Sequence, residues 1–312
     1  MPQIPYRATN FAGAFAHLNG NGQIAATWAQ LVWAAVTVGK AAGDEYAFGV
    51  YSALERLHRA SMMRAYLLEG TSGLLHQTMP YVASDPSEKT SISFYIGMTL
   101  AKLFAEVVFG VPRMLHFAVY GHNYQIAAGQ GASRPDLIGL SANGNWFVFE
   151  AKGRSNGFDN EAMVTAKAQA EQINLINNVA PVCRIASQSF FSTNGLLFHM
   201  DDPERSSSSR SRSLDISSND FNNAYYDPIR AIVESRGRIA ELAVARRRFR
   251  GAQIKEMDCW IALRGQNDSL AEGSDPGPQF SSQYLGKDGV LVRLGPSWSE
   301  ENMRLQPHLR LV

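Results

Sequence analysis

The segment NWFVFEAK, residues 145–152, constrains the fold more than any other stretch of the chain. Because side chains alternate along a strand, Trp146 and Val148 share one face while Phe147 and Phe149 share the other. Both faces are apolar, which is typical of a central strand that is covered on both sides. The segment therefore predicts an α/β protein built around a sheet.

Two charged residues stand at the end of this strand. Glu150 and Lys152 lie on the same face and emerge together where the strand stops. A carboxylate and an ammonium in that position are costly unless they have a partner or a ligand. A strand-end salt bridge without chemistry is the alternative, but it does not explain why Asp136 stands at the start of the preceding apolar segment, PDLIGL.

The loop between the two segments decides whether Asp136 and Glu150 meet. A two-residue turn at Asn143-Gly144 would pair residues whose numbers sum to 287, and the two acids would then face away from each other. A three-residue loop over 142–144 needs a left-handed third residue, which is glycine here, and it pairs residues whose numbers sum to 286. In that register Asp136 lies opposite Glu150, with β-carbons about 5 Å apart.

Two carboxylates at that separation repel each other unless a cation lies between them. We expect Mg²⁺ there, with Mn²⁺ as a substitute, because hard divalent cations take oxygen ligands and keep waters for chemistry. The backbone carbonyl of Ala151 would supply a further oxygen ligand. Lys152 could orient or deprotonate a water, or stabilise negative charge on a phosphoryl group. The group therefore suits metal-assisted attack of water on a phosphodiester.

These residues resemble the PD-(D/E)XK nuclease superfamily, the restriction-endonuclease-like fold. The resemblance rests on Pro135-Asp136, thirteen intervening residues and then Glu150-Ala151-Lys152. It implies an αβββαβ core and Mg²⁺-dependent phosphodiester cleavage, with Asp136 and Glu150 as metal ligands and Lys152 as the catalytic lysine. DNA is the favoured substrate over RNA. Bacterial defence, including antiviral defence, restriction or repair is the role that fold-level analogy suggests.

Periodicity and breakers predict the remaining elements. We expect a helical N-terminal region over 1–88, the nuclease core over 89–201, a Ser/Arg-rich linker or loop over 202–220 and an α+β C-terminal region over 221–312. The expected helices cover 24–38, 45–68, 91–109, 160–178 and 227–248. The expected strands cover 114–121, 135–140, 145–152, 182–191, 195–200, 259–264 and 289–295.

Two further residues are candidates for the catalytic group. Glu106 is the only acid between Glu88 and Asp136, and the resemblance implies an acid from this helix that helps to hold a second metal. A solvated helix glutamate is the alternative. Gln172, on the helix after the motif, interrupts the apolar stripe that includes Val164 and Ala168, so we expect it to reach the site; Gln169 lies on the same helix.

The net charge of +1 conceals one basic region. Between Arg205 and Lys255, ten arginines and one lysine face five acids. The cluster ARRRFRG, 245–251, suits a phosphate backbone, although arginines at a helix end would also complement the helix dipole. Arg154 is a candidate phosphate contact or an exposed strand-end arginine. The expected nucleic-acid contacts are Arg154, Arg246, Arg247, Arg248 and Arg250.

Composition narrows the cellular setting. Two cysteines among 312 residues are too few for a disulfide framework, and a cytoplasmic location is expected. No membrane partner is expected, because the most apolar run, 24–38, is shorter than the roughly 20 residues of a spanning helix. The partner expected beside nucleic acid is a second copy of the chain or a subunit of a defence complex, because nucleases of this fold that cut both strands often pair up. The alternative function is a catalytically inactive nucleic-acid or protein-binding module that keeps the nuclease fold.

Overall fold

A seven-stranded sheet forms the centre of the fold in the computed structural model, which describes residues 1–38, 50–120, 134–203, 212–235, 239–244, 247–264 and 282–299. Strand β7 (Trp146–Arg154) lies inside this sheet, antiparallel to β6 (Leu137–Leu140) and parallel to β9 (Arg184–Ser192). Strand β5 (Arg113–His116) forms one edge. Beyond β9 the order continues through β10 (Gly195–Asp201), β1 (Gln3–Thr9) and β2 (Gly20–Ala25). The protein is therefore of the α/β class.

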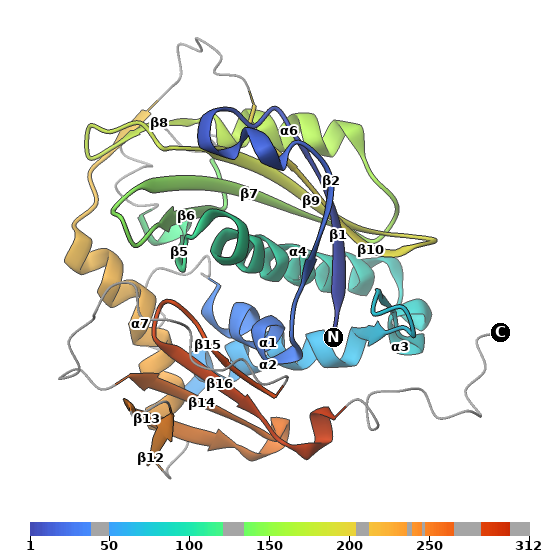
Figure 1. Ribbon diagram of the computed structural model, residues 1–312, viewed down its shortest axis with the longest axis vertical. Coiled ribbons are helices and arrows are strands. Elements are labelled where there is room, and N and C mark those ends of the chain that lie inside the picture. The colour runs from blue at the N-terminus through green and yellow to red at the C-terminus, as the bar shows by residue number, and fades with distance from the viewer. Residues whose placement is uncertain are drawn as a thin grey trace.

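Helices cover both faces of this sheet (Figure 1). On one face lies α4 (Pro86–Phe109), whose Phe109 ring meets Phe149 of β7 at 6.0 Å. On the other face α6 (Asn160–Ala170) places Met163 and Ala166 against Ala186 of β9. The predicted order of helix, three strands, helix and strand within 91–191 is found in part: α4, β5, β6, β7, α6 and β9 are present, with an additional short strand, Ile173–Ile176, between α6 and β9. The strand expected over 114–121 ends at His116 and continues as the 3-10 helix Phe117–Tyr120.

The start of α4 lies earlier than the sequence suggested. The helix expected over 91–109 begins at Pro86, where a proline needs no intrahelical hydrogen bond. Asp85 caps it by accepting from the backbone N–H groups of Ser87 and Glu88. Its end at the left-handed Gly110 agrees with the prediction. Among the described residues α4 alone has the length and hydropathy of a membrane span, and 78% of that window is buried inside the protein.

The helical reading of 1–88 is wrong for its first 25 residues, which form β1, a 3-10 helix (Gly13–Leu18) and β2. Strand β1 pairs with β10, about 190 residues away in sequence, and local periodicity carries no signal of so distant a partner. Further along the region the helices α1 (Trp28–Thr37), α2 (Val50–Tyr66) and α3 (Met79–Ala83) are present, with a small hairpin of β3 (Leu67–Glu69) and β4 (Leu75–Gln77). Of the helix expected over 45–68, residues 45–49 lie outside the described residues.

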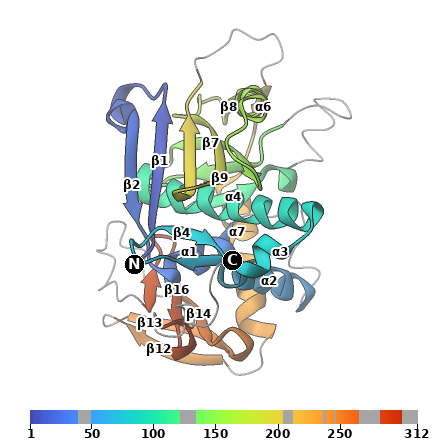
Figure 2. The same ribbon diagram turned by 90° about the vertical axis from the view of Figure 1, so that its right-hand side faces the viewer.

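A second, five-stranded antiparallel sheet occupies the C-terminal part. Its order is β12 (Ile239–Val244), β13 (Arg247–Ile254), β14 (Cys259–Arg264), β16 (Val290–Leu294) and β15 (Gln283–Leu285). The short 3-10 helices Lys255–Met257 and Pro296–Trp298 flank it. In both views α4, α1 and α2 lie between the two sheets (Figure 2). The strands expected at 259–264 and 289–295 are confirmed.

Two predicted helices have the wrong extent. The helix expected over 227–248 is α7 (Ser218–Ser235), which runs through Pro228, and β12 and β13 follow it. The helix expected over 160–178 ends at Ala170, and β8 (Ile173–Ile176) then pairs with β11 (Arg212–Leu214). That pairing also shortens the predicted linker, of which 204–211 lie outside the described residues. At β8 a strand partner remote in sequence overrides the local helical pattern, whereas β12 pairs with the adjacent β13.

Candidate active site

The register of β6 and β7 is the one that brings the acids together. Leu140 pairs with Trp146 and Leu137 with Phe149, so paired residue numbers sum to 286 as the three-residue loop requires. Ser141 closes the loop with a hydrogen bond from its N–H to the Asn145 carbonyl at 3.0 Å. Gly144 has a φ of 77°, the left-handed conformation that the loop demands. Asp136 stands one step beyond the last pair and therefore opposite Glu150.

Backbone groups fix Asp136 at this position. Its Oδ2 accepts a hydrogen bond from the Ala151 N–H at 3.0 Å, and its carbonyl accepts one from the Phe117 N–H at 2.7 Å. In an extended strand the N–H and C=O of one residue point to the same side, so the Ala151 carbonyl also points past the end of β6 toward Asp136. The three groups predicted to supply oxygen ligands to a metal, which are Asp136, Glu150 and the Ala151 carbonyl, thus lie together at one strand end.

Glu150 is fully buried, and only one of its two carboxylate oxygens has a partner. Its Oε1 forms an ion pair with the Lys152 ammonium, while Oε2 is buried without a hydrogen-bond partner. Burial, and then the nearby Asp136 carboxylate, raises the pKa of Glu150 to about 8; the pKa of Asp136 is also raised, chiefly by burial. A buried carboxylate oxygen without a donor is costly, and a divalent cation would remove that cost. The donor set therefore fits Mg²⁺ or Mn²⁺.

Lys152 lies at the mouth of the pair, with 28% of its side chain exposed. Its ammonium donates to Glu150 and, at 2.8 Å, to the side-chain carbonyl of Gln169 on α6. The Gln169 amide donates in turn to the Arg134 carbonyl at 3.3 Å. These contacts hold the ammonium beside the carboxylates and leave part of it open to solvent.

Gln169 is the glutamine that contacts the site, and the prediction that Gln172 reaches it is wrong. Gln172 donates to the Ala168 carbonyl at 3.0 Å. The error came from the apolar stripe, because Val164 is 66% exposed while Met163, Ala166 and Ala170 are the buried residues of α6. Spacing from those buried residues would have placed Gln169 beside the sheet.

Glu106 belongs to a different buried cluster. Its Oε1 accepts from the Tyr284 hydroxyl at 2.7 Å and from the Lys287 N–H at 2.8 Å, both in the second sheet or its turn. Burial and Asp288 raise the pKa of Glu106 to about 7. Lys102, also on α4 and fully buried, lies 4.4 Å from the centre of the Trp33 ring. Glu106 therefore does not complete the Asp136 and Glu150 pair, because it points from α4 toward the second sheet.

The candidate phosphate-binding arginines are divided between two places. Arg154 forms an ion pair with Asp159, whose Oδ1 caps α6 by accepting from the Ala162 N–H at 3.0 Å. On β13, Arg248 and Arg250 are exposed, whereas Arg247 is half-buried. They extend from a strand of the second sheet, not from a helix end, because Phe249 between them is buried in strand alternation. Arg246 lies outside the described residues.

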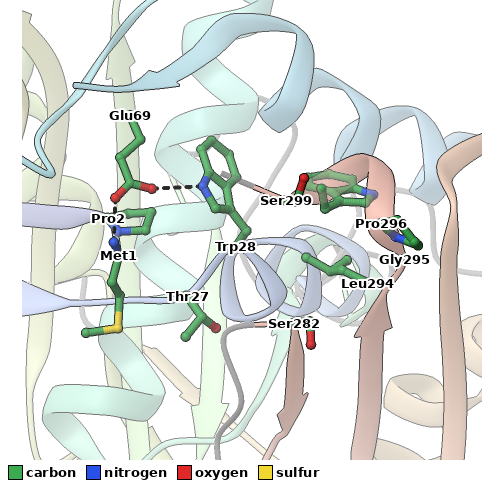
Figure 3. A pocket seen from close by; sticks show the side chains of 11 residues that line it. Met1, Pro2, Thr27, Trp28, Glu69, Ser282, Leu294, Gly295, Pro296 and Ser299 are labelled. Atoms are coloured by element: carbon green, nitrogen blue, oxygen red, sulfur yellow. Dashed lines mark hydrogen bonds and ion pairs between the residues drawn. The ribbon is translucent and has the colours of Figure 1, made fainter. Parts of the chain in front are cut away.

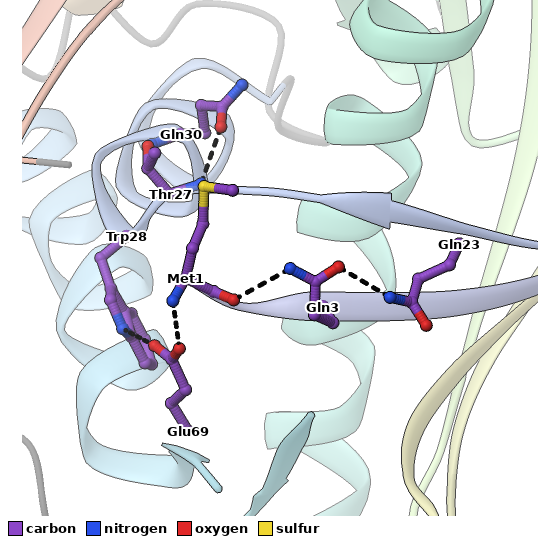
Figure 4. A network of polar contacts seen from close by, with 7 residues as sticks. All are labelled: Met1, Gln3, Gln23, Thr27, Trp28, Gln30 and Glu69. Atoms are coloured by element: carbon purple, nitrogen blue, oxygen red, sulfur yellow. Dashed lines mark hydrogen bonds and ion pairs between the residues drawn. The ribbon is translucent and has the colours of Figure 1, made fainter. Parts of the chain in front are cut away.

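One larger cavity lies away from the carboxylates and lacks comparable chemistry. It measures about 460 Å³ and lies among Pro2, Trp28, Leu294 and Trp298 (Figure 3). The carboxylate at its edge, Glu69, accepts from the Met1 ammonium at 2.5 Å and from the Trp28 indole at 3.1 Å, and both of its oxygens are therefore satisfied (Figure 4). This network joins Met1 to α1 and β3.

Comparison with protein-family models, with curated proteins and with solved structures gives no match to this chain. Within the described residues no cluster of three or more histidine, cysteine, aspartate or glutamate side chains could hold a metal ion. The Asp136 and Glu150 pair falls below that size because its third oxygen is the backbone carbonyl of Ala151.

The buried carboxylate makes stability depend on pH in metal-free protein. A folded-state pKa of about 8 for Glu150 exceeds its ordinary value of 4.5, so its favourable contribution is complete below that value and is lost as pH rises through about 8. We expect the free energy of unfolding in EDTA to fall between pH 5 and 8.5, and to fall less in Glu150→Gln. Urea unfolding at both pH values measures the difference. Equal losses in the two proteins would contradict the burial of an uncompensated charge.

Proposed function

We propose that the protein is a Mg²⁺-dependent nuclease that hydrolyses phosphodiester bonds, with DNA as the favoured substrate over RNA. The observation that carries the proposal is the placement of Asp136 opposite Glu150, with Lys152 bonded to Glu150 at the same strand end. The element order α4, β5, β6, β7, α6 and β9 supports a restriction-endonuclease-like core. A role in bacterial defence, restriction or repair is part of the proposal by analogy of fold.

The residues of the site divide the work of hydrolysis. Asp136, Glu150 and the Ala151 carbonyl would hold the cation, which supplies Lewis-acid stabilisation of the phosphoryl group and a water poised for attack when bound. The Lys152 ammonium stabilises negative charge on a phosphoryl oxygen as the bond to the leaving oxygen breaks. Gln169 positions that ammonium by accepting its hydrogen bond. The carboxylates would therefore act through the cation, while Lys152 acts on the negative charge of the phosphoryl group.

A cleavage assay tests the proposal. Purified protein is incubated with supercoiled plasmid, linear DNA and RNA in Mg²⁺, in Mn²⁺ and in EDTA. We expect nicking or linearisation of DNA with either cation and none in EDTA. Binding of nucleic acid without cleavage under every metal condition would instead support the non-catalytic module, for which the exposed Arg248 and Arg250 provide a contact surface.

Those two arginines lead to a separate prediction about binding. Each phosphate contact that is lost should lower the slope of log binding constant against log salt by about 1. We therefore expect Arg248→Gln with Arg250→Gln to weaken DNA binding and to reduce the slope by about 2. Fluorescence anisotropy across a salt series measures both quantities. Arg230→Gln is the control, since Arg230 is engaged by Asp227 on α7; an equal reduction in that control would show that net charge alone is responsible.

A further inference from the structure

A second pocket lies on the opposite flank of α6 from the carboxylate pair. It measures about 380 Å³ and is formed by the ends of β1 and β10 together with α6. Along α6 the residues Asn160, Val164 and Lys167 line it, and at 100° per residue these point about half a turn away from Gln169. Because Gln169 contacts Lys152, the helix separates the pocket from the candidate active site.

A buried carboxylate in this pocket lacks one hydrogen-bond donor. Asp201 is 2% exposed, and its Oδ2 accepts from the Thr9 hydroxyl at 2.6 Å and the Asn10 amide at 2.9 Å, besides forming an ion pair with Lys167 at 2.8 Å. All of these contacts fall on one oxygen. Oδ1 is buried with no hydrogen-bond partner. Buried polar atoms are rarely left unsatisfied, so a ligand that donates a hydrogen bond, such as a hydroxyl group, would satisfy this oxygen.

The same pocket also presents a cation and an aromatic wall. Arg7, which pairs with His199 across β1 and β10, is exposed, and its guanidinium forms no ion pair or hydrogen bond within the described part of the chain. Arginine binds phosphate through paired N–H groups. Phe158 stacks on the His199 ring at 4.9 Å and remains 37% exposed, which offers an apolar edge to a planar ring.

We propose that this pocket binds a mononucleotide at a site separate from the candidate active site. Arg7 binds the phosphate, the free oxygen of Asp201 accepts a sugar hydroxyl, and Phe158 with Val164 contacts the base. A cavity of about 380 Å³ is of the size that small ligands occupy, which limits the ligand to a single nucleotide. The proposal does not depend on nuclease activity, since no residue of the pocket belongs to the carboxylate pair.

Calorimetry with chemically matched ligands tests each contact. The four ribonucleoside 5′-monophosphates are titrated first, and the tightest is compared with its nucleoside, its 2′,3′-dideoxy analogue and inorganic phosphate. We expect the nucleotide to bind more tightly than the other three, by about tenfold or more for each missing group, since charge-assisted hydrogen bonds are stronger than neutral ones. Undetectable binding of all four nucleotides at millimolar concentration, or equal binding of inorganic phosphate, would overturn the proposal.

Two variants place the ligand in this pocket. Arg7→Gln removes the exposed cation, and Asn160→Glu adds a negative charge at the mouth while suiting the first turn of α6. We expect each to raise the nucleotide Kd by about 10- to 100-fold with the melting temperature unchanged. Arg230→Gln, an equal change of charge on α7, should leave the Kd within about twofold. Nucleotide binding that both pocket variants leave intact would show that the nucleotide binds elsewhere and would overturn the assignment.

Discussion

Asp136→Asn and Lys152→Met should each lower the rate of Mg²⁺-dependent DNA cleavage by about 10³-fold or more. Asp136 supplies a metal ligand, and Lys152 supplies the charge that stabilises the phosphoryl group. Either loss removes several kcal/mol of transition-state stabilisation, and about 1.4 kcal/mol corresponds to a factor of ten in rate. Single-turnover cleavage of a labelled duplex at saturating protein measures the chemical step.

Folding has to be separated from chemistry in this experiment. Neither substitution enlarges a buried side chain, and Lys152 is partly exposed, so near-normal circular dichroism and melting are expected for both variants. Glu161→Gln serves as a matched control, because Glu161 is an exposed acid in the first turn of α6 and contributes no group to the site. Cleavage by Asp136→Asn and Lys152→Met within about fivefold of wild type would contradict the assigned roles.

Gly153→Ala should lower the free energy of unfolding by about 3 kcal/mol or more. A β-carbon at Gly153 would lie 1.8 Å from the Ser93 carbonyl oxygen and 2.2 Å from the Ser93 carbonyl carbon, both backbone atoms of α4. Backbone cannot rotate away as a side chain can, so the helix and strand would have to separate. Because Gly153 directly follows Lys152 on β7, the displacement should also reduce cleavage. Urea denaturation measures the loss of stability.

A neighbouring glycine provides the control for this experiment. Gly157 lies four residues further along the chain, is exposed, and an added β-carbon there would meet no atom within 4 Å. Gly157→Ala should therefore change the free energy of unfolding by less than about 0.5 kcal/mol. If Gly153→Ala were as stable as Gly157→Ala, α4 would not lie against β7 as closely as the structure has it.

The sequence predicted the local geometry of the candidate site because the decisive interactions are close in sequence. The two apolar faces of NWFVFEAK predicted a covered strand, and of two registers that differ by one residue the structure has the one with a three-residue loop closing on Gly144. Asp136 and Glu150 are only fourteen positions apart, so turn chemistry alone settles whether they meet. The helix order around them followed from the same short-range patterns.

The remaining structure depends on partners that are distant in sequence. Strand β1 joins the sheet by pairing with β10, and β8 pairs with β11, so the partner that fixes each strand lies far away in sequence. Glu106 was assigned to the site from its helix, but which side of α4 it occupies depends on the second sheet, about 180 residues later. Gln169 was passed over because the buried face of α6 is set by contact with β9.

The cation itself gives the most direct test of the carboxylate site. Crystals of the wild-type protein soaked in Mn²⁺ should show an anomalous peak between Asp136 and Glu150, about 2.0–2.2 Å from oxygen atoms of both carboxylates and of the Ala151 carbonyl. The same soak of Glu150→Gln should show no peak. Absence of Mn²⁺ from this position in the wild-type protein at saturating concentration, with Glu150 still paired with Lys152, would contradict a metal-dependent active site.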